Sequence, residues 1–146
     1  MNLELRRATE ADVPFLLELR RETMDAHLAA SGAPTTDAYH LERLMYRFEC
    51  AEVLLADGLP SGLLKVDRSA PCWEIVQIQL SQRLQGRGIG RVLLEQVLAE
   101  ADGCGADVSL SVLKANPARG LYERLGFALI SEDRIEFHMF RPARPR

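Results

Sequence analysis

A glycine-rich loop between an apolar strand and an amphipathic helix is the feature that most constrains this chain. The loop reads Gln-Gly-Arg-Gly-Ile-Gly over residues 85–90, after the apolar run 75–80 and before the helical pattern 91–101. Glycine lets a backbone turn tightly and brings its amides close to a ligand, since no Cβ stands in the way. The first turn of a helix adds unpaired N–H groups and a positive dipole end, and both favour phosphate. The loop therefore predicts a site for a phosphate-bearing ligand.

Two common nucleotide-binding loops do not fit this spacing. A dinucleotide fingerprint G-x-G-x-x-G that begins at Gly86 would need glycine at position 91, which is Arg91. A P-loop would need Gly-Lys followed by Ser or Thr, and the chain contains no Gly-Lys pair. What Gln85, Gly88 and Gly90 do match is the pattern Q/R-x-x-G-x-G/A.

That pattern resembles the pyrophosphate loop of the GCN5-related N-acetyltransferases. A second motif, Leu-Tyr-Glu-Arg-Leu-Gly-Phe at residues 121–127, is similar to the L-Y-x-x-x-G-F helix of the same family. Two separate motifs, each on its expected element, make the resemblance specific. It implies an α/β fold for residues 1–146, a single N-acetyltransferase domain with a mixed, mostly antiparallel central sheet flanked by helices, in the order β-α-α-β-β-β-α-β-α-β-β.

Apolar periodicity and turn residues predict the same order of elements. Strands are expected at residues 3–8, 53–56, 63–66, 73–80, 108–113, 127–131 and 135–141. Helices are expected after the N-cap Thr9, over residues 37–49, over residues 91–102 and from Pro117 to Leu125, with Asn116 as the last N-cap.

The resemblance implies acetyl-CoA as co-substrate, with its diphosphate on the amides of the glycine loop and its pantetheine arm along the end of the preceding strand. The residues that it assigns to cofactor binding are Ile78, Gln79, Leu80, Gln85, Gly86, Arg87, Gly88, Ile89, Gly90, Arg91 and Asn116. A backbone N–H near Leu80 would stabilise the oxyanion that forms during acyl transfer. Surface solvation is an equal alternative for Arg87 and Arg91, and helix capping is the main role expected of Asn116.

Tyr122 and Glu74 are the candidate catalytic residues. A tyrosine is protonated at neutral pH, so Tyr122 can donate a proton to the departing thiolate. Glu74 is expected on the same strand face as Leu80, and desolvation beside Trp73 would suit it to act as the general base. The alternatives are a core tyrosine and an exposed glutamate. His27, Tyr39 and His40 are expected to be surface or packing residues, and a base acting through water there stays open.

The acceptor is expected to be a small-molecule amine or a peptide amine, attacked directly in a ternary complex. Acidic residues in the first two helices favour a cationic amine, and they are Glu22, Asp25, Asp37, Glu42 and Glu49. A non-catalytic acyl-CoA sensor is the alternative function, and it would not need Tyr122. The family resemblance also suggests a homodimer, for which the sequence locates no interface.

Composition and charge exclude several other classes. The net charge of −3 argues against a general nucleic-acid binder, and the basic segment 141–146 is interpreted as a short solvated tail. Three widely spaced cysteines suggest neither a metal site nor a disulfide framework. No run approaches the ~18 apolar residues of a membrane span, so no membrane association and a cytoplasmic location are expected.

Overall fold

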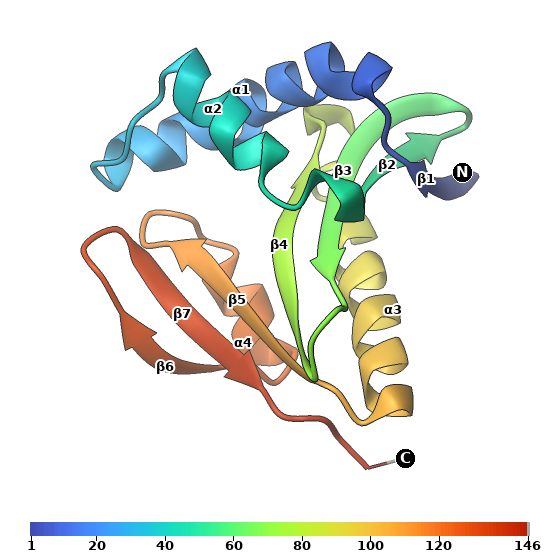
Figure 1. Ribbon diagram of the computed structural model, residues 1–146, viewed down its shortest axis with the longest axis vertical. Helices are drawn as coiled ribbons and strands as arrows, with labels where there is room; N and C mark the ends of the chain where they lie inside the picture. The colour runs from blue at the N-terminus through green and yellow to red at the C-terminus, as the bar shows by residue number, and fades with distance from the viewer. Residues whose placement is uncertain (146) are drawn as a thin grey trace.

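A seven-stranded sheet of order β1-β2-β3-β4-β5-β7-β6 organises the protein, whose computed structural model describes residues 1–145 (Figure 1). The strands are β1 Leu3–Arg7, β2 Ala51–Ala56, β3 Leu59–Asp67, β4 Cys72–Leu80, β5 Asp107–Leu113, β6 Ala128–Glu132 and β7 Glu136–Arg141. The α-helices are α1 Val13–Ala30, α2 Asp37–Met45, α3 Ile89–Cys104 and α4 Arg119–Arg124. Every strand pair is antiparallel except β4 and β5, which are parallel. The predicted fold class and element order are confirmed.

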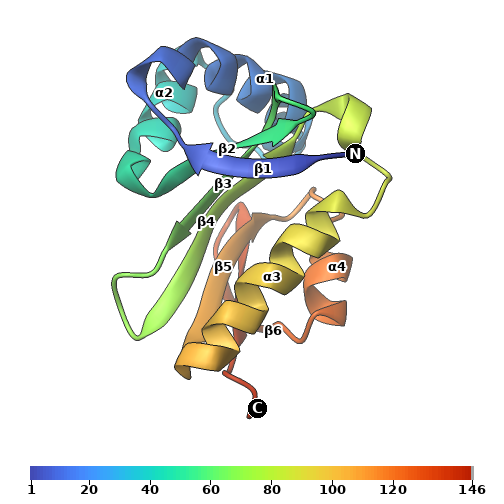
Figure 2. The same cartoon turned by 90° about the vertical axis from the view of Figure 1, so that its right-hand side faces the viewer.

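The helices pack in two groups, shown in Figure 2. The apolar stripe of α3, which includes Leu94, Val97 and Leu98, packs with the largest core cluster, and Tyr122 of α4 joins it. The second group, α1 and α2, lies at one end of the sheet and forms a separate cluster with β2 and β3. Amphipathic helices thus cover the sheet by burying their apolar stripes.

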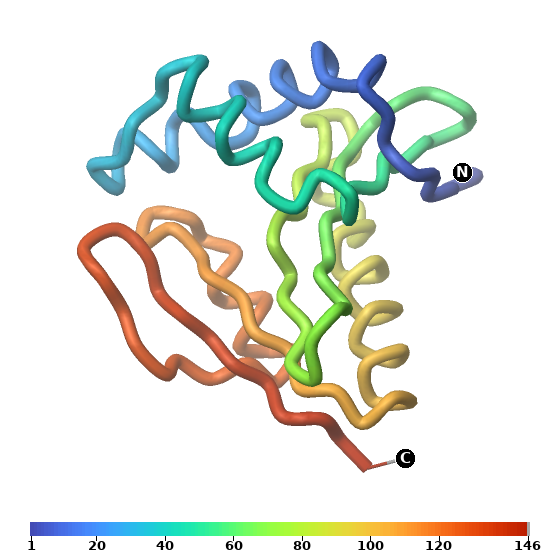
Figure 3. Tube along the Cα trace, in the orientation of Figure 1, coloured from blue at the N-terminus to red at the C-terminus, as the bar shows by residue number. Residues whose placement is uncertain are grey.

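The central strands β4 and β5 separate along their length. They pair only from Cys72 to Ile75 on β4 and from Asp107 to Leu110 on β5. Beyond Ile75 the strands diverge towards the end of the sheet where α1 and α2 lie, as Figures 1 and 3 show. Between Val76 and Leu80, the edge of β4 that faces β5 therefore has no strand partner.

A β-bulge at Val76 changes which side chains share a face of β4. Lys65 of β3 pairs with Gln77, whereas the next residue of β3, Val66, pairs with Ile75, so Val76 is the extra residue. Ile75 and Ile78 consequently both pack on the side of α3, whereas Gln77 contacts α2 on the opposite side.

Helix α2 is shorter than predicted. The pattern suggests a helix over residues 37–49, but α2 ends at Met45 and a 3-10 helix, η2 Phe48–Cys50, follows. The buried Lys65 explains this end, because its Nζ donates hydrogen bonds to the carbonyl oxygens of Leu44 and Tyr46, both at 2.6 Å. A cation at the last carbonyls of a helix satisfies groups that have no intrahelical partner.

Arg141, the first residue of the predicted solvated tail, is the last residue of β7. Arg141 is buried and forms a bidentate ion pair with Asp102 of α3, at 2.9 and 3.0 Å. The backbone N–H of Ala143 donates to Asp107, and that of Arg144 donates to Asp102. The sequence-based interpretation as a solvated tail is therefore wrong for Arg141, whereas Pro142, Arg144 and Pro145 are exposed, and Arg146 lies outside the described residues.

Candidate active site

The glycine loop presents a row of free backbone amides. From Gly86 to Arg91, none of the N–H groups has a hydrogen-bond acceptor within residues 1–145. The first bond of this region that involves α3 is donated by Val92 to the carbonyl of Gly88. The loop itself is exposed, so these amides and the N-terminus of the long helix α3 are available to an anion.

Two glycines of the loop have backbone conformations that favour glycine. Gly86 and Gly88 have φ angles of 76° and 74°, and Gly88 is the N-cap of α3. A Cβ at either position would meet no heavy atom within 4 Å, so the constraint comes from the backbone rather than from packing. Gln85 fixes the start of the loop, because its Nε2 donates to the carbonyl of Leu80 at 3.0 Å.

The other loop residues differ in what their side chains do. Ile89 is buried against β2 and α3 and anchors the loop, so only its backbone faces outward. Arg87 is exposed and has no partner within the described part of the chain, whereas Arg91 forms an exposed ion pair with Glu95 at 2.9 Å. Arg87 is thus a cation beside the loop that has no ion-pair partner in residues 1–145.

A cleft beside this loop, here called the loop cleft, runs along the unpaired edge of β4. Its walls are the end of β4, the first turn of α3 and the start of α4, with α1 above. Among its lining residues are Ile78, Gln79, Leu80, Gln85, Gly90 and Asn116. Most predicted cofactor residues therefore meet in one cleft, next to the free amides.

A second cleft, here called the arginine cleft, opens between β4, β7 and the helices α1 and α2. Its lining residues include Arg20, Tyr39, Arg43, Gln77, Gln79 and Glu136. Arg20 and Arg43 come from different helices, and Glu136 comes from the start of β7. The sequence analysis did not assign Arg20, Arg43, Gln77 or Glu136 to a site. The one signal that could have marked them is a polar side chain at a position where local periodicity predicts a buried residue.

Tyr122 lies where the two clefts meet, and it lines both. The residue is 7% exposed, and its ring makes an edge contact with Phe127. Burial raises the pKa of the Tyr122 hydroxyl to about 12, so the phenol is protonated at neutral pH. No group within residues 1–145 forms a hydrogen bond with that hydroxyl, which leaves it available to a bound molecule.

Asn116 also lines both clefts, at the entry to α4. Its Oδ1 accepts a hydrogen bond from the N–H of Ala118 at 2.9 Å, which closes the turn before α4, whereas the N-cap of α4 is Ala118 and not Asn116 as predicted. The regular helix begins at Arg119, later than predicted, because Pro117 and Ala118 form a turn before it.

The sequence-based placement of Glu74 beside Leu80 is wrong. Glu74 pairs with Asp67 and Leu80 pairs with Gly62, and the bulge at Val76 puts the two side chains on opposite faces of β4. Glu74 lines neither cleft. Glu136 does line the arginine cleft, and burial raises the pKa of its carboxyl above the ordinary value despite the opposing charge of Arg43.

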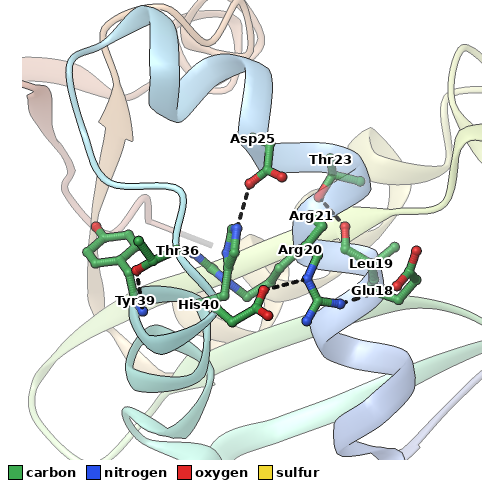
Figure 4. Close-up of polar contacts among 10 residues, drawn as sticks. Glu18, Leu19, Arg20, Arg21, Thr23, Asp25, Thr36, Tyr39 and His40 are labelled. Carbon is green, nitrogen blue, oxygen red and sulfur yellow. Dashed lines mark hydrogen bonds and ion pairs between the residues drawn. The ribbon is translucent and has the colours of Figure 1, made fainter.

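A polar chain of His40 and Asp25 orients Arg20, which lines the arginine cleft; Figure 4 draws these three residues. The Nε of Arg20 donates to His40 Nδ1 at 3.2 Å, and His40 Nε2 lies 2.6 Å from Asp25 Oδ1. His40 is fully buried, which confirms a packing role and adds a positioning one. Burial, reinforced by the charge of Arg43, lowers the pKa of Arg20 to about 10, so Arg20 stays charged at neutral pH.

Comparison with known proteins assigns the chain to a family. The model of the acetyltransferase (GNAT) family matches residues 18–127, which include the glycine loop, Tyr122 and most of the sheet. The chain belongs to the GNAT acetyltransferase family. The resemblance inferred from the two sequence motifs is thereby confirmed. A comparison with curated protein sequences finds no match.

Solved structures of other GNAT-fold proteins are similar over nearly the whole chain. The PaiA N-acetyltransferase of Thermoplasma acidophilum, solved with coenzyme A, is 19% identical with a TM-score of 0.75, over 97% of this chain and 99% of that one. An acetyltransferase of Thermus thermophilus is 24% identical, with a TM-score of 0.75 and 97% of each chain covered. The ribosomal-protein-S18-alanine N-acetyltransferase of Escherichia coli is 19% identical, with a TM-score of 0.72 over 97% and 94%. At these identities the likeness establishes the fold.

Neither a metal-binding cluster nor a membrane-spanning helix is found in the described part of this GNAT protein. Within residues 1–145, no group of three or more His, Cys, Asp and Glu side chains is arranged to hold a metal ion. In the same part of the chain, no helix combines the length and the apolar character that crossing a membrane requires.

Proposed function

We propose that this GNAT protein is an acetyl-CoA-dependent N-acetyltransferase that acts on an amine in a ternary complex. The observation that supports this most directly is the position of Tyr122, whose unpartnered hydroxyl lies between the loop cleft and the arginine cleft. A proton donor at the junction of two clefts suits a reaction that joins two bound substrates. Residues 1–146 would act as a single N-acetyltransferase domain.

The loop cleft is the proposed cofactor site. Six consecutive free amides and the N-terminus of α3 suit the diphosphate of coenzyme A, with Arg87 as a nearby counter-charge. The unpaired edge of β4 around Ile78 and Leu80 suits the amide groups of the pantetheine arm, which would extend the sheet locally. Acetyl-CoA, when bound, supplies an activated acetyl group as a thioester.

The arginine cleft is the proposed acceptor site. During transfer the new N–C bond forms and the C–S bond breaks, while the amine loses one proton and the sulfur gains one. Tyr122 would donate the proton to the sulfur, because it stays protonated at neutral pH. We propose Glu136 rather than Glu74 as the proton acceptor, since Glu136 lines the cleft and its raised pKa brings it closer to the working pH of a general base.

One pair of measurements tests this proposal against the alternative, a non-catalytic acyl-CoA sensor. Calorimetric titration with acetyl-CoA measures cofactor binding, and release of free thiol in the presence of an amine panel measures transfer. An N-acetyltransferase binds acetyl-CoA and releases thiol only when an accepted amine is present. Binding without thiol release on any amine would favour the sensor, and the absence of binding would overturn both functions.

A cytoplasmic location is also proposed. Cys50, Cys72 and Cys104 are all free, and two of them are exposed. Exposed thiols that stay unpaired suit a reducing compartment.

A further inference from the structure

We propose that the arginine cleft selects an amine acceptor that also carries a carboxylate, with Arg20 and Arg43 binding the carboxylate. The class of acceptor is therefore a free amino acid or a related amino-carboxylate. This inference rests on the proposed N-acetyltransferase function and specifies the substrate of the same site.

The first evidence is that neither arginine has a carboxylate partner. Within the described residues, no Asp or Glu lies within ion-pair distance of Arg20 or Arg43. Arg20 is only 3% exposed, and its one hydrogen-bond partner is His40, at Nε. Its two terminal nitrogens have no partner in residues 1–145. A buried guanidinium normally has an anion beside it, and a ligand carboxylate would supply one.

The second evidence is the way Arg20 is held. Because Arg20 Nε is a donor, His40 Nδ1 must accept, and His40 Nε2 then carries the proton that faces Asp25. His40 is therefore the neutral tautomer and keeps Asp25 on its far side, away from the cleft. Figure 4 shows this order of the three residues. The chain fixes the guanidinium through Nε and leaves its terminal nitrogens for a ligand.

The third evidence is the surplus of positive charge on this side of the cleft. Buried Lys65 lies close enough to Arg20 and Arg43 for their charges to lower the pKa of Lys65, although burial is the larger cause. Its Nζ contacts main-chain carbonyls only, so it adds no anion. Burial and these two charges lower the pKa of Lys65 to about 7, so Lys65 is only partly protonated at neutral pH. The repulsion that an anionic ligand would relieve is therefore the one between Arg20 and Arg43, and, after burial, this repulsion also lowers the pKa of Arg20.

The fourth evidence is a set of groups suited to the amine of the same molecule. The Oε1 atoms of Gln77 and Gln79 are buried without a hydrogen-bond donor in residues 1–145, and both residues line the cleft. The Nε2 of Gln77 donates to the carbonyl of Arg43 at 3.0 Å, which fixes the orientation of that amide. Together with the Glu136 carboxylate, these acceptors suit N–H donors. A molecule with an amine and a carboxylate matches both sides of the cleft.

The acidic residues that favoured a cationic acceptor lie elsewhere. Asp37 pairs with Arg21, Asp25 faces His40, and Glu22 accepts a hydrogen bond from the N–H of Gln82. The five acidic residues that favoured a cationic acceptor, Glu22, Asp25, Asp37, Glu42 and Glu49, all lie outside the lining of the arginine cleft. A polycationic amine in the arginine cleft would instead lie beside the positive charges of Arg20 and Arg43. We therefore replace the cationic acceptor that the sequence favoured with an amino-carboxylate.

Matched substrates test the proposal. The protein saturated with acetyl-CoA would be assayed for thiol release with the common protein amino acids, β-alanine and 4-aminobutyrate. Each amino acid would be compared with its carboxamide, and the two other acids with β-alaninamide and 4-aminobutyramide. The same compounds would be titrated calorimetrically into the coenzyme A complex, which measures binding without turnover. For the best acceptor we expect the carboxamide to have a kcat/KM about 10- to 100-fold lower, mainly through KM.

Variants of Arg20 and Arg43 test whether these arginines cause the preference for the carboxylate over the carboxamide. Arg43→Gln should lower kcat/KM on the amino acid about 10- to 100-fold and leave kcat/KM on its carboxamide within about 2-fold. Arg20→Lys should act in the same direction, and circular dichroism would check that it folds. Arg21→Gln is the control, because Arg21 neighbours Arg20 on α1 but pairs with Asp37 and Glu18 outside the cleft. Arg21→Gln should leave kcat/KM unchanged on both the amino acid and its carboxamide.

The outcomes separate this inference from the proposed function. Equal efficiency on acids and carboxamides, or transfer only to amines without a carboxylate, would overturn the carboxylate site and leave the N-acetyltransferase proposal standing. Binding of an amino acid that Arg43→Gln weakens, without thiol release, would support the site and overturn the proposed function. If no amino-carboxylate binds the coenzyme A complex, the inference is wrong.

Discussion

Glu74 and Ile78 lie on opposite faces of β4, although regular alternation would place them on the same face. Glu74 pairs with Asp67, and Ile78 pairs with Leu64. The side chains of those two β3 residues point to opposite sides of the sheet. The extra residue Val76 shifts the register of β4, so that Glu74 and Ile78 point to the same sides as their β3 partners. The bulge thereby directs Gln77 and Gln79 into the arginine cleft and keeps Ile78 against α3.

Glu136 and Glu74 can be separated by their pH profiles. A general base acts when deprotonated, so the rate should rise with pH through the raised pKa of Glu136. Glu136→Gln should remove this acid limb and lower kcat by about 100-fold or more. Glu74→Gln should keep the limb and most of the activity. Loss of the limb in Glu74→Gln alone would restore the original assignment of the base.

The Tyr122 hydroxyl is expected to matter for chemistry and not for folding. Tyr122→Phe keeps the ring that packs against Phe127 and removes a hydroxyl without a protein partner. We expect kcat to fall by about 100-fold, with the Kd for acetyl-CoA and the melting temperature nearly unchanged. Tyr46→Phe is the control, because Tyr46 is exposed and lines neither cleft. Wild-type turnover in Tyr122→Phe would rule out the proton-donor role.

The two glycines that flank α3 provide a matched test of the phosphate loop. Gly88 at the N-terminus and Gly105 at the C-terminus have φ angles of 74° and 69°, and a Cβ at either meets no atom within 4 Å. Alanine should therefore cost about 1–2 kcal/mol of stability at both positions. Only Gly88→Ala should also weaken acetyl-CoA binding, by about 10-fold, since it disturbs the free amides. Equal Kd values for the two variants would argue against the loop as the diphosphate site.

Asp12 should make stability depend on acid pH. Two hydrogen bonds from Arg6, both at 2.8 Å, lower the pKa of the Asp12 carboxyl to about 2, and the N–H of Thr9 contributes. Because the folded pKa is below the ordinary value of 3.8, this contribution is complete above about pH 4 and is lost as pH falls towards about 2. Asp12→Asn should cost about 1–3 kcal/mol at pH 7 and much less near pH 2.

Urea unfolding at both pH values would check this. Asp37→Asn, in an exposed ion pair, should cost little at either pH. A cost of Asp12→Asn that stays constant with pH would contradict the assignment.

Most of the fold could be predicted because its signals are local. The seven strands and four helices follow from apolar periodicity, and the glycine loop and Tyr122 follow from short motifs. The errors have non-local causes. Lys65 of β3 ends α2 at Met45, and Asp102 of α3 pairs with the buried Arg141, so neither the end of α2 nor the burial of Arg141 is encoded in its own segment.

The sequence by itself determined the family, the glycine loop and the candidate proton donor. These depend on residues close together in the chain, where glycine conformation, helix ends and spacing act directly. Only the tertiary structure decided what the second cleft contains. The divergence of β4 from β5 after Ile75 opens the sheet, and it brings Arg20, Arg43 and Glu136 together from three separate elements. These three residues lie close together because of long-range packing, which local sequence patterns do not predict.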